Sequence, residues 1–168
     1  MSKLRIAVAA LGFSAAALLG LVNHEWYTDT AVIPVKGDVP TVGFGSTTRE
    51  DGSPVKMGDT TTPVRALNRT MAYVQGAEAD FKRCVHVPLT QGEFDVYLDF
   101  GYQYGMPTLC ASSIARHLNA GEYLEACDAL LKYKFAAGFD CSTPGNKRCP
   151  GVWARQRARH ERCLAEQP

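Results

Sequence analysis

The sequence has almost no excess of charge of either sign. Its 168 residues contain 18 Lys and Arg against 17 Asp and Glu, a formal net charge of +1 at pH 7. Proteins that bind nucleic acid through their overall field are usually strongly basic, so we expect no nucleic-acid partner. Basic side chains do crowd one C-terminal stretch, with Arg155, Arg157, Arg159, His160 and Arg162. We interpret this stretch as a solvated helix face, with contact to cell-wall glycan or lipid headgroups as the alternative.

Spacings typical of a metal site are also absent. None of the six cysteines forms a CxxC pair, and the four histidines (His24, His86, His117 and His160) are scattered along the chain. Structural zinc sites need closely spaced Cys and His ligands. We therefore predict no metal ion and no cofactor. The sequence also lacks internal repeats and low-complexity linkers, and its length suits a single domain.

Cysteine is missing from the first 83 residues, since the first is Cys84. An even number of cysteines beside an export segment favours disulfides formed in an oxidising compartment such as the bacterial periplasm. Six cysteines allow many pairings, and buried free thiols are the alternative. The turn at Pro144-Gly145 would bring Cys141 and Cys149 together. The remaining pairs then follow by elimination as Cys84–Cys110 and Cys127–Cys163.

A long uncharged run, Ile6–Val22, follows Lys3 and Arg5. A positive flank before an apolar run is typical of an export signal, and Ala15-Ala16-Ala17 offers a cleavage site. The run is long for a signal core and near the lower limit for crossing a bilayer core of about 30 Å. More than half of it is Ala, Gly or Ser, and Ala and Gly favour membrane insertion only weakly. We expect residues 1–23 to be an uncleaved, weak membrane anchor; a cleaved signal peptide and a buried soluble helix are the alternatives.

Residues 24–168 are predicted to form an α+β domain. β-branched residues on either side of Gly37-Asp38 predict two short strands, with a third near Val55. Helical periodicity and capping signals then predict five helices. These run from Pro63 to about Arg83, from the capping box Thr90-Gln91-Gly92-Glu93, from Ser112/Ser113 through Leu118, over Glu122–Phe135 and over Val152–Leu164. This order predicts a small β-hairpin lobe and a helical lobe with a cleft between them.

One carboxylate has a position suited to acid catalysis. Glu25 lies three residues after the apolar run, and the glycine-rich segment Thr41-Val42-Gly43-Phe44-Gly45 follows. Cleavage of a glycosidic bond needs an acid to protonate the leaving oxygen and a second group that activates water or stabilises the cationic transition state. Partial burial beside the apolar run and Trp26-Tyr27 would raise the pKa of Glu25 as such an acid requires. Alternatively, Glu25 is only the polar end of the export segment.

Glu25 followed by Thr41-Val42-Gly43-Phe44-Gly45 resembles the phage-type lysozymes, glycoside hydrolase family 24, in which a catalytic glutamate precedes a T-[IV]-G-x-G hairpin. Three later segments are similar to motifs of the same family, and together the matches cover most of residues 23–164. They are Val87–Asp95, similar to VPLTQ-x-x-FD, Leu118–Tyr123, similar to LNAGDY, and Pro150–Arg159, similar to PGL-x-x-RR. Within the family, the chain most resembles the exported endolysins with a signal-anchor-release segment.

This resemblance implies a lysozyme-like fold and a monomeric endolysin that hydrolyses the β-1,4 bond between N-acetylmuramic acid and N-acetylglucosamine of peptidoglycan, causing host-cell lysis. Glu25 is implied to be the general acid, and Thr41 could position the attacking water. Gly43 and Gly45 would let the substrate approach the backbone, or would only permit a β-bulge. The subgroup implies export to the host periplasm, first tethered to the inner membrane and inactive, then released in an active soluble form.

The second catalytic carboxylate departs from the family pattern. The expected aspartate would fall on Val35, and the stretch from Glu25 to Thr41 is one residue too long. We assign the role to Asp38, at the hairpin turn near Thr41. Asp29 is interpreted as a surface or capping residue, and an enzyme that works with Glu25 and Thr41 alone is the alternative. Other functions to weigh are a lytic transglycosylase, which forms an anhydro-sugar, and a catalytically inactive, membrane-tethered peptidoglycan-binding module.

Overall fold

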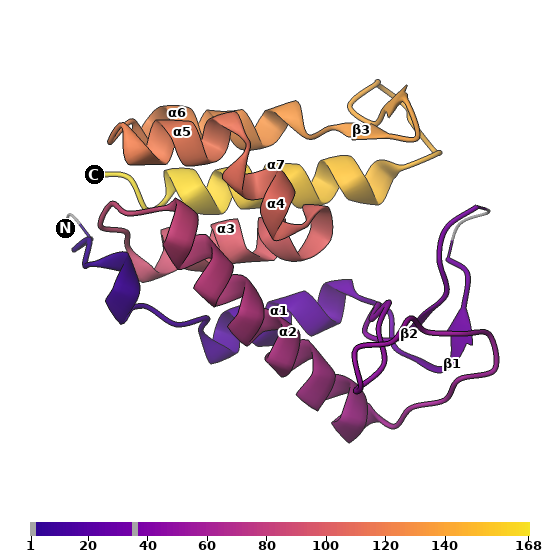
Figure 1. The fold of residues 1–168 in the computed structure, drawn as a ribbon. Helices are drawn as coiled ribbons and strands as arrows, with labels where there is room; N and C mark the ends of the chain where they lie inside the picture. Colours follow the sequence, from indigo (N-terminus) through magenta and orange to yellow (C-terminus); the bar gives the residue numbers. More distant parts are fainter. Residues whose placement is uncertain (1–2, 35–36) are drawn as a thin grey trace. The chain divides into compact units, whose positions relative to one another are not determined.

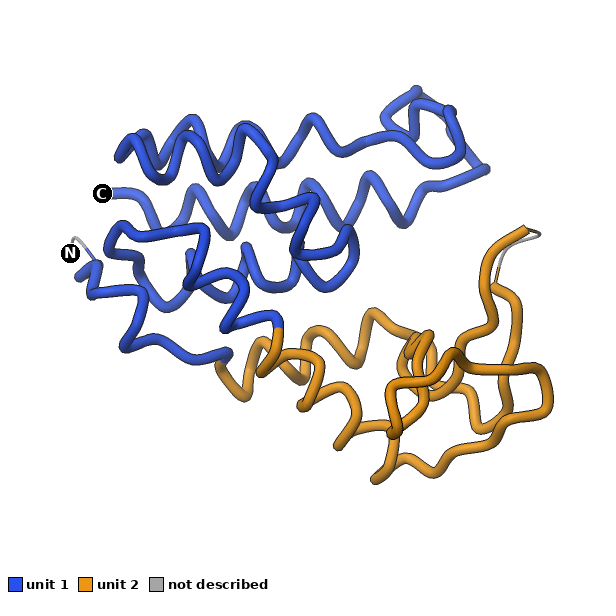
Figure 2. The backbone as a smooth tube through the Cα atoms, viewed as in Figure 1, with its two compact units in different colours: residues 1–13, 77–168 blue, residues 14–76 orange. Residues whose placement is uncertain are grey.

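The computed structural model describes residues 3–34 and 37–168 (Figure 1). Contacts within the chain divide it into two compact units, coloured separately in Figure 2. Unit 1 consists of residues 1–13 and 77–168, and unit 2 consists of residues 14–76. The boundary passes through the longest helix, α2 (Pro63–Cys84), so that this helix begins in unit 2 and ends in unit 1.

Unit 2 carries helix α1 (Ala15–His24) and a two-stranded sheet. The helix begins after Ser14, whose hydroxyl accepts a hydrogen bond from the Ala17 N–H at 3.1 Å, as an N-cap does. β1 (Thr28–Val32) pairs antiparallel with β2 (Thr41–Gly43), and the register is irregular between its ends. Buried Ala31, Val42 and Val55 form a small core. In place of the expected third strand near Val55, Thr48 and Pro54 form an isolated β-bridge. A longer ladder does not form at Pro54, because proline has no N–H to donate.

Unit 1 is helical and is centred on α3 (Gln91–Tyr104), which packs against α4 (Met106–Cys110) and α7 (Pro150–Leu164). α5 (Ser113–Asn119) packs against α6 (Tyr123–Ala129), which continues into the 3-10 helix η2 (Leu130–Lys132). The predicted capping box at the start of α3 is present. Thr90 Oγ1 accepts from the Glu93 N–H at 3.0 Å, and Glu93 Oε2 accepts from the Thr90 N–H at 2.8 Å.

Two parts of unit 1 differ from the sequence prediction. The helix expected over Glu122–Phe135 stops earlier, and β3 (Phe135–Ala136) pairs with β4 (Phe139–Asp140). The two residues between these strands both have positive φ, 47° at Ala137 and 77° at Gly138, as in the two-residue hairpin turns that match strand twist. The short helix α4 was not predicted, because five residues are too few to show helical periodicity.

The C-terminal arginines are not all on a solvated face. Arg159 is 2 % exposed, and its Nε donates to Asp99 Oδ2 at 2.6 Å. Arg155 Nη2 donates to the other oxygen of Asp99 at 2.8 Å. On the same helix, Arg157 is exposed and pairs with Glu161 at 3.5 Å. The stretch therefore divides into a buried ion-pair cluster and a solvated face, because positions 155 and 159 are one helical turn apart and face α3.

The apolar N-terminal run does not form one helix. Val8–Ala10 form a 3-10 helix, η1, in unit 1, and the α-helix begins only at Ala15 in unit 2. Ile6 exchanges two backbone hydrogen bonds of 2.9 Å with Leu89, and Val8 belongs to the core of unit 1. These contacts hold the backbone before Ser14 outside an α-helix. Across the described residues, no helix combines the length and apolar character needed to cross a membrane.

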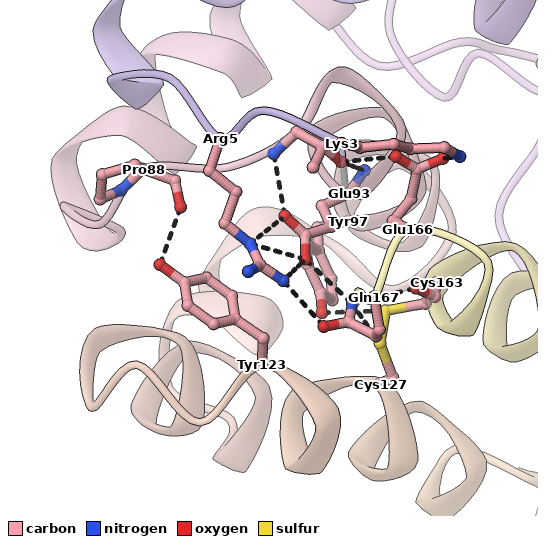
Figure 3. A network of polar contacts seen from close by, with 11 residues as sticks. Lys3, Arg5, Pro88, Glu93, Tyr97, Tyr123, Cys127, Cys163, Glu166 and Gln167 are labelled. Atoms are coloured by element: carbon pink, nitrogen blue, oxygen red, sulfur yellow. Dashed lines mark hydrogen bonds and ion pairs between the residues drawn. A yellow bond between two sulfur atoms is a disulfide. The ribbon is translucent and has the colours of Figure 1, made fainter. Parts of the chain in front are cut away.

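A polar network holds the N-terminus against α3 (Figure 3). Arg5 donates to both carboxylate oxygens of Glu93, with a shortest distance of 2.7 Å, and Glu93 is fully buried. Gln167 Nε2 donates to the same carboxylate at 2.9 Å. The Arg5 guanidinium also lies 3.6 Å from the ring centre of Tyr123, a cation–π contact. The Arg5 counter-charge of Glu93 is therefore present only while the segment before Ser14 lies against the rest of unit 1.

Three disulfides connect unit 1: Cys84–Cys110, Cys127–Cys163 and Cys141–Cys149. They are the pairs that were predicted from the sequence. The first joins α2 to α4, the second joins α6 to α7, and the third closes the loop before α7.

We expect the disulfides to differ in the free energy of unfolding that they contribute. The sequence separation is 36 residues for Cys127–Cys163 and 8 for Cys141–Cys149. Loop-closure entropy then predicts a loss of about 4 kcal/mol for the double alanine variant of the first pair and about 2.5 kcal/mol for that of the second. Urea unfolding measures both. Equal losses would contradict the entropic argument. Alkylation of the folded, oxidised protein before reduction should label none of the six cysteines.

Candidate active site

Glu25 terminates α1 and lies half-buried in unit 2. Its backbone N–H donates to the Leu21 carbonyl at 3.1 Å, which makes it the C-cap of the helix. A Cβ atom added to Gly45 would lie 3.2 Å from Oε2 of Glu25. The carboxylate therefore lies beside the backbone of the glycine-rich segment.

Gly43 and Gly45, the two glycines of this segment, have different surroundings and different roles. Gly43 has φ +70°, and an added Cβ would lie 2.7 Å from the Cβ of Ala66 in α2, too close for any side chain. Gly45 has φ +78° and is exposed. Gly43 is thus needed for packing against α2. Gly45 leaves open space beside the carboxylate of Glu25, so of the two it is the one that suits close approach of a substrate.

Aromatic side chains lie on both segments of the site. The rings of Tyr27 and Phe44 are 5.4 Å apart, and the Tyr27 hydroxyl donates to the Thr61 carbonyl at 3.4 Å. Trp26 is 92 % exposed. The partial burial of Glu25 therefore does not come from Trp26, contrary to the sequence interpretation, because a side chain so exposed covers little of its neighbour.

Thr41 begins β2 opposite Val32 and is half-buried. Its hydroxyl donates to the Val32 carbonyl at 3.5 Å, a distance at which a hydrogen bond is weak. The hydroxyl is therefore held loosely at the end of the sheet, and a bound water could compete for it.

Asp38 and Asp29, the two candidates for the second carboxylate, each accept a hydrogen bond from the next residue in the chain. Asp38 is exposed, and its Oδ1 accepts from the Val39 N–H at 2.8 Å. Asp29 is also exposed and accepts from the Thr30 hydroxyl at 3.3 Å. Val35, where the family aspartate would fall, is outside the described residues. Neither contact involves Glu25 or Thr41, so the role of Asp38 stays a prediction. In the part of the chain that is described, no three His, Cys, Asp or Glu side chains gather as metal ligands would.

Unit 2 also has a charged pocket of about 480 Å³, which was not predicted from the sequence. Its charged lining consists of Arg49, Glu50, Asp51, Asp59, Arg65 and Arg69. Hydrogen bonds from Arg49, at 2.6 and 2.7 Å, lower the pKa of Asp59 to about 2. Hydrogen bonds from Arg65, at 2.9 and 3.1 Å, likewise lower the pKa of Glu50. The one available signal was the helical spacing of Arg65 and Arg69, which places both on one face of α2.

The sequence model of the phage lysozyme family matches residues 22–159, a stretch that contains Glu25, the hairpin and all the later helices up to most of α7. The chain belongs to the phage lysozyme family. The match begins at the end of the apolar run, so this run lies almost entirely outside it.

Relatives of this chain include endolysins of two phages. The SAR-endolysin of Pseudomonas phage phiKMV is 35% identical over 119 residues, which cover 71% of this chain and 70% of the relative. The endolysin of Salmonella phage P22 is 32% identical over 98 residues, which cover 58% of this chain and 67% of the relative.

Solved structures agree with the family assignment. The endolysin from Escherichia coli O157:H7 phage FAHEc1 superposes with a TM-score of 0.77 at 25% identity, over 95% of this chain and 98% of that one. The muramidase domain of SpmX from Asticaccaulis excentricus has a TM-score of 0.74 at 18% identity, over 92% and 98% of the two chains, and shows the likeness of the fold. The α+β, lysozyme-like fold expected from the sequence is thus confirmed.

Proposed function

We propose that this protein is an endolysin that hydrolyses the β-1,4 bond between N-acetylmuramic acid and N-acetylglucosamine of peptidoglycan, with Glu25 as the general acid. The observation that carries the proposal is the half-buried Glu25 carboxylate beside the exposed backbone of Gly45. An acid in that position can meet a sugar ring that lies against the hairpin. Membership in a lysozyme family supports a glycosidase-type reaction.

In the proposed reaction, the protonated Glu25 donates its proton to the glycosidic oxygen as the bond to the anomeric carbon breaks. A water molecule attacks that carbon, and its proton passes to a base, so that two sugars with free hydroxyl groups result. The Thr41 hydroxyl orients this water. It is available for this role because its hydrogen bond to the Val32 carbonyl is long and weak. We assign the second carboxylate role to Asp38, whose Oδ1 accepts from the Val39 N–H.

Turbidity of permeabilised Gram-negative cells and the mass of the released fragments test this function. We expect lysis and fragments that end in a reducing N-acetylmuramic acid. Fragments lighter by one water would identify a lytic transglycosylase instead. Binding to peptidoglycan without lysis would identify an inactive binding module.

We further propose that the protein is exported and begins as a membrane-tethered, inactive form. The uncharged run after Lys3 and Arg5 supports this, as does the likeness to a relative named as a SAR-endolysin. Trp26 and Tyr27 follow the run, at the depth where aromatic residues favour the membrane interface. With Ile6–Val22 in the bilayer, Glu25 would be held at the membrane surface. Release would let the same residues fold as the present structure has them, with Arg5 paired to Glu93.

Strengthening the anchor should block release. Ala15 and Ala16 are exposed, and a Cβ on Gly20 would meet no atom within 4 Å, so leucine at these three positions fits the released fold. Ala17 is left unchanged because it is buried. Leucine favours membrane insertion far more than alanine or glycine, so we expect the triple variant to stay in the membrane fraction and to delay lysis after an uncoupler is added. A matched variant with serine at the same positions should be released at least as readily as the wild type. Wild-type protein that is soluble from the start and trimmed after Ala17 would rule out the tether.

A further inference from the structure

Positive charge gathers in one disulfide-closed loop of unit 1. Between Asp128 and Glu161 the sequence has seven Lys and Arg but only one acidic residue, Asp140. Three of the seven are the arginines of α7, which pair with Asp99 or with Glu161. The other four lie within residues 132–149, which we call the basic loop: Lys132, Lys134, Lys147 and Arg148.

The backbone of the basic loop is held in place by several contacts. β3 pairs with β4, and the Cys141 N–H donates to the Lys134 carbonyl at 2.8 Å. Asn146 Nδ2 donates to the Cys141 carbonyl at 2.9 Å, and the Cys141–Cys149 disulfide closes the loop. In Figure 1, β3 and the loop after it lie at the end of unit 1 opposite the C-terminus. The loop therefore keeps its basic side chains together at one end of this unit.

Most of this positive charge has no counter-charge within the loop. Lys134 Nζ lies 2.8 Å from Asp140 Oδ2, and this contact, with the Ser142 hydroxyl, lowers the pKa of Asp140 to about 2. Asp140 is therefore ionised at neutral pH and balances one cation. The other three cations are exposed, and no carboxylate of the described residues forms an ion pair with them. They are Lys132, Lys147 and Arg148.

The basic loop also presents apolar rings beside its cations. Phe135 is 55% exposed, and the Lys134 ammonium lies 5.6 Å from its ring centre. The Arg148 guanidinium lies 5.4 Å from the ring centre of Phe139. Both distances fit cation–π contacts. Since an exposed phenyl ring is unfavourable in water, a partner that accepts cations and an apolar ring together would suit this surface.

We propose that the basic loop binds the anionic surface of a lipid bilayer. Lys and Arg side chains are attracted by the negative potential of anionic headgroups. An apolar ring next to them can enter the boundary between headgroups and acyl chains, as in proteins that lie on a membrane. A soluble polyanion would use the cations but would leave Phe135 in water, so the exposed ring favours the bilayer.

This contact is separate from the N-terminal membrane tether. In the folded chain Lys3 pairs with Glu166 and Arg5 with Glu93, so the cations of the N-terminal segment are already matched. The basic loop remains exposed in this same fold. It gives the soluble form its own attraction to a membrane surface, one that does not depend on the glycosidase reaction.

Co-sedimentation of the purified, soluble chain with lipid vesicles tests the binding. One set of vesicles contains phosphatidylglycerol and phosphatidylcholine in equal parts, and the other contains phosphatidylcholine alone. We expect binding to the anionic vesicles to be tighter by about tenfold or more, and to weaken as salt screens the charges. The neutral vesicles control for the apolar N-terminal run, because insertion of that run needs no anionic lipid.

Charge variants locate the contact. Each cation removed near an anionic surface should weaken binding about fivefold, so Lys147→Gln/Arg148→Gln should weaken it about 25-fold. The matched control, Arg157→Gln/Arg162→Gln, removes the same charge from exposed positions outside the loop and should change binding no more than about twofold. Asp140→Asn releases Lys134 while its amide oxygen can still accept from Ser142, so binding should strengthen about fivefold.

Phe135→Ser separates a bilayer from a soluble polyanion. It should weaken binding to the anionic vesicles and leave binding to soluble polyphosphate unchanged, because only the bilayer offers an apolar layer for the ring. Polyphosphate bound tightly by a wild type that binds the vesicles weakly would assign the loop to a soluble polyanion and overturn the proposal.

Two further results would also overturn it. One is equal binding of the wild type to anionic and neutral vesicles. The other is anionic binding that the control variant weakens as much as Lys147→Gln/Arg148→Gln does. The melting temperature establishes that each variant is folded, and if the loop variant is not, Asp140→Asn decides.

Discussion

Glu25→Gln should abolish lysis and leave the fold intact. Glutamine has nearly the shape of glutamate but has no proton to donate to the glycosidic oxygen. A general acid contributes about 10²–10⁴-fold to the rate, so lysis of permeabilised cells should fall to a few per cent of wild type or less. Because Glu25 is half-buried at the end of α1 and beside Gly45, the amide fits without displacing its neighbours. The melting temperature should stay close to that of the wild type.

The control compares the two candidate second carboxylates. Asp38→Asn should lower the rate by about 10²–10⁴-fold if Asp38 acts as the general base, whereas Asp29→Asn should be nearly neutral. The opposite pattern would show that the assignment of Asp38 is wrong. Two neutral variants would leave an enzyme that works with Glu25 and Thr41 alone. Residual lysis by Glu25→Gln well above a few per cent would point to another acid.

The helices were predictable because their signals are local. Thr90 and Glu93 form the capping box with bonds of 3.0 and 2.8 Å, and Ser112 caps α5 as its position before an apolar segment suggested. Each signal involves residues three or fewer positions apart, so the sequence alone displays it. The β3–β4 hairpin gave no such signal. Its strands are two residues long, and Ala137 adopts a positive φ that alanine rarely takes.

The site was predictable only in part, for the same reason. Glu25 and the glycine-rich hairpin are visible in the sequence. That Gly43 packs on Ala66 while Gly45 faces Glu25 depends on the fold. The pairing of charged side chains was even less predictable from the sequence. Nothing in the sequence shows that Arg49 pairs with Asp59. Nor does it show that Nε and Nη1 of Arg69 have no acceptor among the described residues. The C-terminal arginines were misinterpreted because their partner, Asp99, lies 56 and 60 positions away.

That partnership leads to the largest expected effect on stability. Asp99→Asn should lower the free energy of unfolding by about 3–5 kcal/mol, the cost of removing one partner from a buried ion pair. Arg159 is 2 % exposed, and its Nε bond to the Asp99 carboxylate is 2.6 Å long, so its charge would stay buried without a counter-charge. Urea unfolding measures the loss. The matched control, Glu161→Gln, breaks the exposed pair with Arg157 and should cost no more than about 0.5 kcal/mol.

The pH dependence gives this prediction a second test. Burial raises the pKa of Asp99, but the neighbouring charges of Arg159 and Arg155 outweigh it, and the net pKa is lowered. A carboxyl whose pKa is lower in the folded state contributes stability above its ordinary pKa and loses it as the pH falls through the folded value. The difference in stability between wild type and Asp99→Asn should therefore be full at neutral pH and shrink below about pH 4. A difference that stays constant down to about pH 2 would show that the variant acts by disturbing packing around Arg159 rather than by removing its counter-charge.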